Sequence, residues 1–174
     1  MAIKIDYAKH AIAESTLLAA TRGGANIYSV KLTTDLDNGS VVNITDMEYQ
    51  GPEYFNQVKP ASTKKVGLVL QDPLIYQESP TAATDPANFY NEKGDIVRVY
   101  ELVEGDIFTV SAAAIAAVGD APVKGNYIVA DNYGLKEVAK ASAPADTVAF
   151  VATIIGTVKR TNGTFYKIRV AKNA

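Results

Sequence analysis

Short runs of β-branched and aromatic residues recur along this chain, and glycine, asparagine or aspartate separates each run from the next. The clearest pair lies near the C-terminal end, where residues 148–159 and 165–170 flank a Thr-Asn-Gly-Thr sequence at 161–164. An Asn-Gly step between two such runs favours a β-hairpin, because both residues tolerate the backbone conformation of a tight turn. Alternation along residues 165–170 predicts one buried face and one wetter face.

The same pattern predicts further strands at residues 26–32, 41–44, 65–70, 96–97, 107–108 and 124–129. Asp37-Asn38-Gly39 lies between the first two runs, so we expect those runs to pair across a hairpin turn. Gly94-Asp95 and Gly105-Asp106 each stand directly before β-branched or aromatic residues, which is typical of a turn that leads into a strand.

Two segments favour helix instead. Residues 6–20 are rich in Ala, Leu, Glu and Lys, with Asp6 available as N-cap and Gly23-Gly24 able to end a helix. They lack a clean apolar stripe, so an arm that becomes ordered on a partner is an equal alternative. The alanine-rich residues 111–118 predict a short helix or one turn, and the turn formers of residues 79–91 predict a long surface loop.

Together these elements predict a mainly β fold, an antiparallel β-barrel or β-sandwich with one or two short helices. A doubly wound α/β fold is disfavoured because helices do not alternate with the strands. The 174 residues suit one domain of ordinary size. We expect residues 1–22 to form the N-terminal helix or docking arm and residues 23–174 a β-rich domain, with a further division near 79–92 left open.

Composition narrows the classes of function. Hydrophobic residues make up 48% of the chain and charged residues 21%, which is enough apolar material for a core. Lys plus Arg number 17 against 19 Asp plus Glu, so we expect no nucleic-acid partner. Without cysteine the chain has no disulfide or thiolate metal site. We expect no secretory signal and no membrane span, since polar residues interrupt every apolar run.

Residues that could carry chemistry are few, and each has a simpler interpretation. His10 is the chain's one histidine, and we expect it to be a solvated helix residue. Asp95 and Asp106 resemble a carboxylate pair, but each follows a glycine where turns favour aspartate. The loop from Asp35 to Gly39 departs from the EF-hand pattern, which leaves weak cation binding there as an open alternative. We therefore expect no enzyme and no cofactor.

The ten tyrosines, with no tryptophan, are a distinctive aromatic choice. Several lie in or beside predicted loops, where a ring with a polar tip suits a protein interface or a sugar-binding surface. The alternative is that most of them fill strand edges and the barrel rim.

Three features of the chain resemble accessory capsid proteins of tailed bacteriophages, of the head decoration or head-fibre type. They are the leader at residues 1–10, the Gly-Asp turns at Gly94 and Gly105, and the hairpin from residues 154–157 to 168–170. The resemblance implies attachment to the assembled lattice of a major capsid protein, as a homo-oligomer that stabilises or decorates the head. It also implies a location on the capsid exterior of the virion, assembled in the host cytoplasm.

Two hypotheses about binding follow. In the first, residues 1–22 dock on the capsid while the β-rich domain packs against neighbouring copies. The predicted partner-binding residues are Tyr7, Leu17, Leu18, Tyr54, Phe55, Phe89 and Tyr90. In the second, the chain is a carbohydrate-binding or host-adhesion module of a phage particle that uses the loop tyrosines Tyr54, Tyr76, Tyr90 and Tyr133. A hydrolase with a carboxylate pair ranks last.

Overall fold

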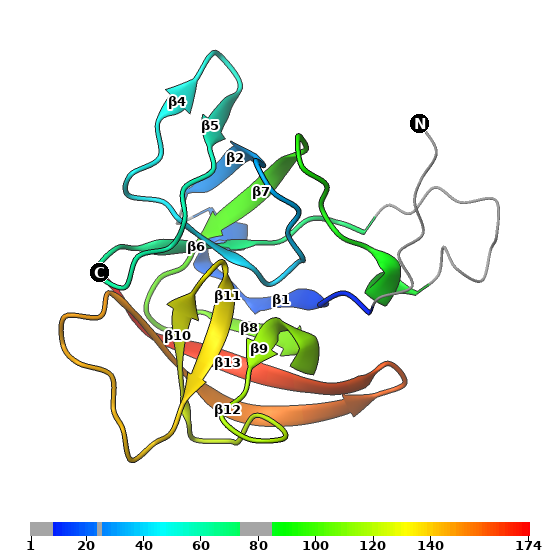
Figure 1. Ribbon diagram of the computed structural model, residues 1–174, viewed down its shortest axis with the longest axis vertical. Coiled ribbons are helices and arrows are strands. Elements are labelled where there is room, and N and C mark those ends of the chain that lie inside the picture. The colour runs from blue at the N-terminus through cyan, green and yellow to red at the C-terminus, as the bar shows by residue number, and fades with distance from the viewer. Residues whose placement is uncertain (1–8, 24–25, 74–84) are drawn as a thin grey trace.

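The structure is a computed structural model, and it describes residues 9–23, 26–73 and 85–174. The chain is mainly β, with two sheets and, among the described residues, helical structure limited to short 3-10 turns (Figure 1). This confirms the predicted fold class of an antiparallel barrel or sandwich. In Figure 1 the long β12–β13 hairpin lies at the bottom of the view and the β4–β5 hairpin projects at the top.

Sheet A has seven strands in the spatial order β1-β8-β13-β12-β10-β11-β9. Their bounds are β1 (Ala13–Leu17), β8 (Ile107–Ser111), β9 (Ile115–Ala116), β10 (Tyr127–Asp131), β11 (Gly134–Val138), β12 (Phe150–Arg160) and β13 (Gly163–Asn173). All neighbours pair antiparallel except β11 and β9, which pair parallel.

Sheet B has six strands in the order β3-β6-β7-β2-β5-β4. Their bounds are β2 (Ile27–Lys31), β3 (Val41–Asn43), β4 (Tyr49–Gln50), β5 (Tyr54–Asn56), β6 (Val66–Val69) and β7 (Ile96–Glu101). The 3-10 turns are η1 (Ala19–Arg22), η2 (Pro86–Asn88) and η3 (Ala112–Ala114). The parallel pairing of β2 with β5 places Lys31 beside Asn56.

The main core lies between the two sheets. Sheet A contributes large side chains such as Phe108, Phe150 and Ile168, and sheet B contributes Val41 and Leu68. A second core, formed within sheet B, contains Val30, Val69, Val97 and Val99 with partly buried Tyr133 against them. Strand β6 is buried along its whole length because its alternate residues face the two cores. This explains why its sequence is an unbroken apolar run.

Several of the predicted strands and turns are confirmed. The C-terminal hairpin forms, although Arg160 pairs with Gly163 and the turn is therefore centred on Thr161 and Asn162. Strands also form at 27–31, 66–69 and 127–131, as predicted. The alanine-rich segment makes a single 3-10 turn, η3. In the predicted loop, residues 85–91 include the turn η2, and residues 79–84 lie outside the described residues.

The predicted helix over residues 6–20 is wrong where the structure describes it. Residues 13–17 are strand β1, which pairs antiparallel with β8, and Thr16 shares a 2.8 Å hydroxyl hydrogen bond with Thr109. Tertiary pairing therefore overrides the helix propensity of this segment. The helical conformation is confined to η1, which Gly23 ends at a φ of 78° as predicted. Asp6 lies outside the described residues.

The predicted hairpin between residues 26–32 and 41–44 is also wrong. The turn itself forms, with Gly39 at a φ of 91° and a hydrogen bond from the Ser40 N–H to the Asp37 carbonyl. However, β2 pairs with β7 and β5, and β3 pairs with β6. The strand partners come from distant parts of the chain because the apolar sides of β2 and β7 meet in the second core.

Sheet B contains residues from both sides of the segment 79–92. Strand β7 follows this segment and pairs with β2 and β6, which precede it.

Candidate functional site

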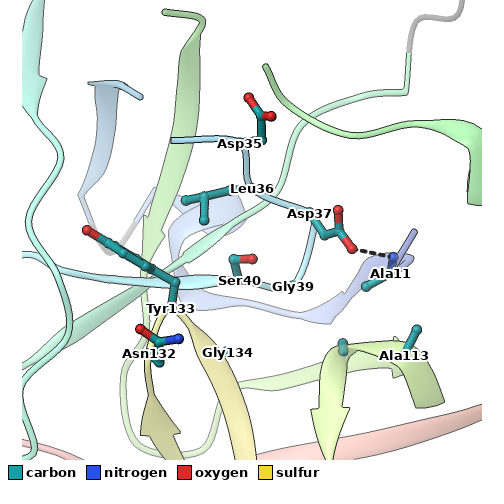
Figure 2. A pocket seen from close by; sticks show the side chains of 11 residues that line it. Ala11, Asp35, Leu36, Asp37, Gly39, Ser40, Ala113, Asn132, Tyr133 and Gly134 are labelled. Atoms are coloured by element: carbon teal, nitrogen blue, oxygen red, sulfur yellow. Dashed lines mark hydrogen bonds between the residues drawn. The ribbon is translucent and has the colours of Figure 1, made fainter. Parts of the chain in front are cut away.

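A pocket of about 240 Å³ lies where the two sheets meet (Figure 2). Tyr133, in the turn between β10 and β11, has its ring beside Leu36 and Ser40. Asn132 and Tyr133 have φ values of 44° and 66°, and the Tyr133 carbonyl accepts a 2.8 Å hydrogen bond from the Val41 N–H. A bulky residue with positive φ is strained, and here it joins a hairpin of sheet A to β3 of sheet B. Burial raises the pKa of Tyr133.

The acidic residues at this pocket hold chain segments together. Asp37 accepts hydrogen bonds from the Ala11 N–H and from the His10 ring, each at 2.8 Å (Figure 2 shows the first). Asp35 accepts a 2.7 Å bond from the Lys93 N–H. No group of three or more His, Asp or Glu side chains that could hold a metal ion occurs in the described ranges. The carboxylates of this loop thus already serve as hydrogen-bond acceptors for the protein's own chain.

His10 is not the solvated helix residue that the sequence predicts. Its backbone N–H donates to the Ala87 carbonyl, its side chain is 15% exposed, and its ring stacks on Tyr90 with centroids 4.6 Å apart. It therefore tethers the start of β1 to the segment around η2.

Asp95 and Asp106 have the turn roles expected of them. Asp95 makes two hydrogen bonds with the backbone of Glu92. Its carboxylate accepts from the Glu92 N–H at 3.0 Å, and its own N–H donates to the Glu92 carbonyl at 3.0 Å. Asp106 does the same with Val103 at 2.9 and 3.1 Å, and its second oxygen accepts from the Ala19 N–H. Each aspartate stabilises its own turn.

Glu137 is an almost fully buried carboxylate in β11, with 1% of its surface exposed. It accepts hydrogen bonds from the Val118 N–H at 2.9 Å, the Val123 N–H at 2.7 Å and the Asn126 side chain at 2.7 Å. Burial raises the pKa of Glu137, but these three donors outweigh it, so the pKa lies below the ordinary value. The carboxylate fixes the loop between β9 and β10.

A larger groove, with a volume of about 780 Å³, lies on sheet B. It is lined by Lys31, Leu32, Thr33, Gln50, Tyr54, Asn56, Lys93 and Gly94. Pairing places Asn56 beside Lys31 and Gln50 beside Tyr54, so these four side chains share one face of the sheet. The Lys31 ammonium lies 5.1 Å from the centroid of the Tyr54 ring. We call this feature the groove.

The outer face of sheet A carries a row of side chains that we call the docking row. Strand pairing joins its members in the order Leu17, Ile107, Arg169, Thr153, Tyr127 and Val138. Their chain neighbours, such as Phe108 and Ile168, lie in the main core, so the row faces away from it. Leu17 is 39% exposed, Arg169 is exposed, and the other members are partly exposed. A hollow of about 390 Å³ opens beside Thr153, Ile155 and Arg169.

The predicted partner-binding residues fall in different places. Leu17 belongs to the docking row, whereas Leu18 is buried in the main core with 1% exposed. Tyr54 lines the groove, while Phe55 points to the opposite face of β5 and makes edge contacts with Tyr28 and Tyr49.

The remaining predicted residues are dispersed as well. Tyr90 stacks on His10, and Phe89 follows η2 and is half-buried. Tyr7 and Tyr76 lie outside the described residues. Tyr54, Tyr90 and Tyr133 do not share one site, because they lie at the groove, at His10 and at the pocket between the sheets.

Sequence reasoning missed most of the residues that form these surfaces. No local motif sets apart Lys31, Lys93, Gln50 and Asn56. The β2–β5 pairing brings Lys31 to Asn56, the β4–β5 pairing adds Gln50, and Lys93 reaches the groove from the turn before β7. The alternation in residues 165–170 indicates which face of its strand Arg169 occupies. It does not predict the row across six strands.

No helix in the described part of the chain is long and apolar enough to span a bilayer. Comparison with family models, with curated proteins and with solved structures finds no match for this chain.

Proposed function

We propose that this chain is a virion structural protein that binds the assembled lattice of a major capsid protein and stabilises or decorates the head. The class comes from the resemblance to accessory capsid proteins of tailed phages. The observation that carries the proposal is the docking row, in which three aliphatic side chains, a tyrosine, an arginine and a threonine lie side by side on the outer face of sheet A. This role requires binding and no catalytic step.

The chemistry of the docking row suits a protein interface. Arg169 stands near the middle of the row, with Ile107 on one side and Thr153 on the other. Arginine and tyrosine, together with tryptophan, are enriched at the energetic centre of interfaces, where surrounding contacts exclude water. Ile155, which is 36% exposed, extends the apolar surface next to Arg169 at the hollow.

The scaffold under the row keeps it in a fixed shape. Five of the six row residues lie on strands that also contribute large side chains to the main core. A preordered surface loses little conformational entropy on binding. A ligand that binds the assembled lattice but not the free subunits stabilises the assembled state. Many copies that each bind weakly can therefore stabilise a lattice together.

A co-sedimentation assay tests the proposal, with the purified chain and heads assembled from a tailed-phage major capsid protein. Wild-type chain is expected to pellet with the heads and to saturate. Arg169→Ala is expected to raise the dissociation constant about 30-fold, the effect of losing a central contact worth about 2 kcal/mol. The measurement is the bound fraction as a function of chain concentration.

Arg98→Ala provides the matched control, because Arg98 is an exposed arginine on β7 of the other sheet. It should bind heads like the wild-type chain. If wild-type chain stays in the supernatant, or if both arginine variants bind equally well, the proposal fails.

A second candidate function is the carbohydrate-binding or host-adhesion module. The groove favours it, because Tyr54 offers a ring beside the amides of Gln50 and Asn56. A glycan array that stays blank while heads are bound would rule this candidate out.

A further inference from the structure

We propose that the groove on sheet B is a binding site for an acidic saccharide. This activity is separate from capsid docking, because the groove and the docking row lie on different sheets. It narrows the second candidate function to a chemical class of ligand.

The groove combines the groups that saccharides require. A sugar ring has an apolar face that packs on an aromatic ring, and Tyr54 lies partly exposed in the groove wall. Sugar hydroxyls need donors and acceptors at fixed positions, and Gln50 and Asn56 flank Tyr54 on the same face of the sheet. The Thr33 hydroxyl already donates to the Gln57 side chain at 2.8 Å, so it adds an acceptor at the groove.

The charge of the lining selects an acidic ligand. Lys31 and Lys93 are exposed lysines, and the described residues that line the groove include no carboxylate. The chain as a whole has a net charge of −2, so the local charge of the groove lining is opposite in sign to that of the chain. A carboxylate or sulfate on a sugar would form charge-assisted hydrogen bonds with the two ammonium groups.

Hydrogen bonds hold the groove lining in place. The Thr33 N–H donates to the buried Gln57 side chain at 2.6 Å, and the Lys93 N–H donates to Asp35 at 2.7 Å. The Asn56 side-chain oxygen accepts from the Glu48 N–H at 2.6 Å, which leaves its NH₂ group as the donor for a ligand. A site that is formed before the ligand arrives loses less free energy on binding.

A nucleic acid fits the groove less well. Binding a phosphate backbone draws its affinity from a track of many cations, and the groove supplies two. A single tyrosine also gives a short stacking platform for bases.

Isothermal titration of the full chain tests the proposal with two acidic probes, tri-galacturonic acid and sialyllactose, against the neutral probes maltotriose and lactose. At least one acidic probe is expected to bind at least tenfold more tightly than its neutral counterpart. Lys31→Gln and Lys93→Gln are each expected to weaken that binding about tenfold, and Tyr54→Ala to abolish it. Raising the salt from 50 to 500 mM should also weaken it.

Lys140→Gln is the control, because Lys140 is an exposed lysine that follows β11 and lies outside the groove lining. It should bind the acidic probe like the wild-type chain. The proposal is overturned if neither acidic probe binds, if the neutral probes bind equally, or if Lys31→Gln and Lys93→Gln bind normally. Tighter binding of a ten-residue oligothymidylate would overturn it as well. Head co-sedimentation of these variants should be unchanged, which separates this result from a failure of the capsid proposal.

Discussion

Tyr133 has a strained backbone conformation at a position where it contacts both sheets. Its φ of 66° is one that glycine adopts freely and that costs other residues about 1 kcal/mol or more. Its ring packs against the second core, and its carbonyl accepts a hydrogen bond from Val41. The strain at one residue therefore accompanies the contact between a sheet A hairpin and sheet B.

Two substitutions separate these contributions at position 133. Tyr133→Ala and Tyr133→Gly both remove the ring, so both should lower the free energy of unfolding. Glycine should be the more stable of the two by about 1 kcal/mol, which reverses the usual order for an ordered position. Urea denaturation of both variants measures the difference. Equal stabilities, or alanine above glycine, would contradict the strain at this residue.

Glu137 should make part of the stability depend on pH. Its folded-state pKa lies below the ordinary value of 4.5, so its contribution is present above that value and is lost as the pH falls. Glu137→Gln should lower the free energy of unfolding by about 2 kcal/mol at pH 7. The glutamine amide has a single acceptor oxygen for the three groups that donate to the Glu137 carboxylate, the Val118 N–H, the Val123 N–H and the Asn126 side chain.

The difference in the free energy of unfolding between the Glu137→Gln variant and the wild-type chain should become smaller as the pH is lowered from 6 to 3. Urea denaturation at several pH values measures it. Glu53→Gln, a change in the exposed turn between β4 and β5, is the control and should have little effect at any pH. A difference that stays constant with pH would show that the carboxylate charge contributes nothing.

Strand β6 lies between two cores, and its glycine reflects that position. A Cβ atom on Gly67 would lie 2.5 Å from a methyl group of Val99 and 2.8 Å from one of Ile44. Gly67→Ala should therefore lower the free energy of unfolding by about 1–3 kcal/mol through overpacking. Gly156→Ala in β12 is the control, because nothing lies within 4 Å of its added Cβ. Similar thermal unfolding curves for the two variants would contradict the packing of β6.

The end of strand β1 separates a residue that supports the fold from one that faces a partner. Leu18 is buried, so Leu18→Ala should cost about 2–4 kcal/mol of stability. Leu17 is 39% exposed in the docking row, so Leu17→Ala should change stability by less than about 0.5 kcal/mol and weaken binding to heads. Denaturation and co-sedimentation of both variants check this. Unchanged head binding by Leu17→Ala would remove Leu17 from the docking surface.

Elements whose pairing is local could be predicted from the sequence, and those whose pairing is distant could not. The β12–β13 hairpin has its turn and both strands in one continuous segment, so alternation and Asn162-Gly163 sufficed. Strand β1 was missed because its sequence has helix propensity and its partner, β8, lies about ninety residues further along the chain. Distance along the chain also explains the wrong partner for β2, whose neighbour β7 lies about seventy residues further on.

At the scale of the whole molecule, both candidate surfaces arise from the assembly of distant segments. The groove draws on residues near 31–33, 50–56 and 93–94, and the docking row draws on six strands. Tyr54 and Leu17 could be proposed from sequence as aromatic and apolar contacts. Lys93 lies near Tyr54, and Arg169 lies in the same row as Leu17, only because of the sheet topology. No local sequence pattern predicts either position.

Electron cryomicroscopy of heads that carry the full chain would examine the central claim directly. Density for the chain is expected on the exterior of the head, with the outer face of sheet A against the capsid lattice and with Leu17 and Arg169 inside the contact. Heads without density for the chain, or a contact that leaves both residues in solvent, would contradict the proposed function.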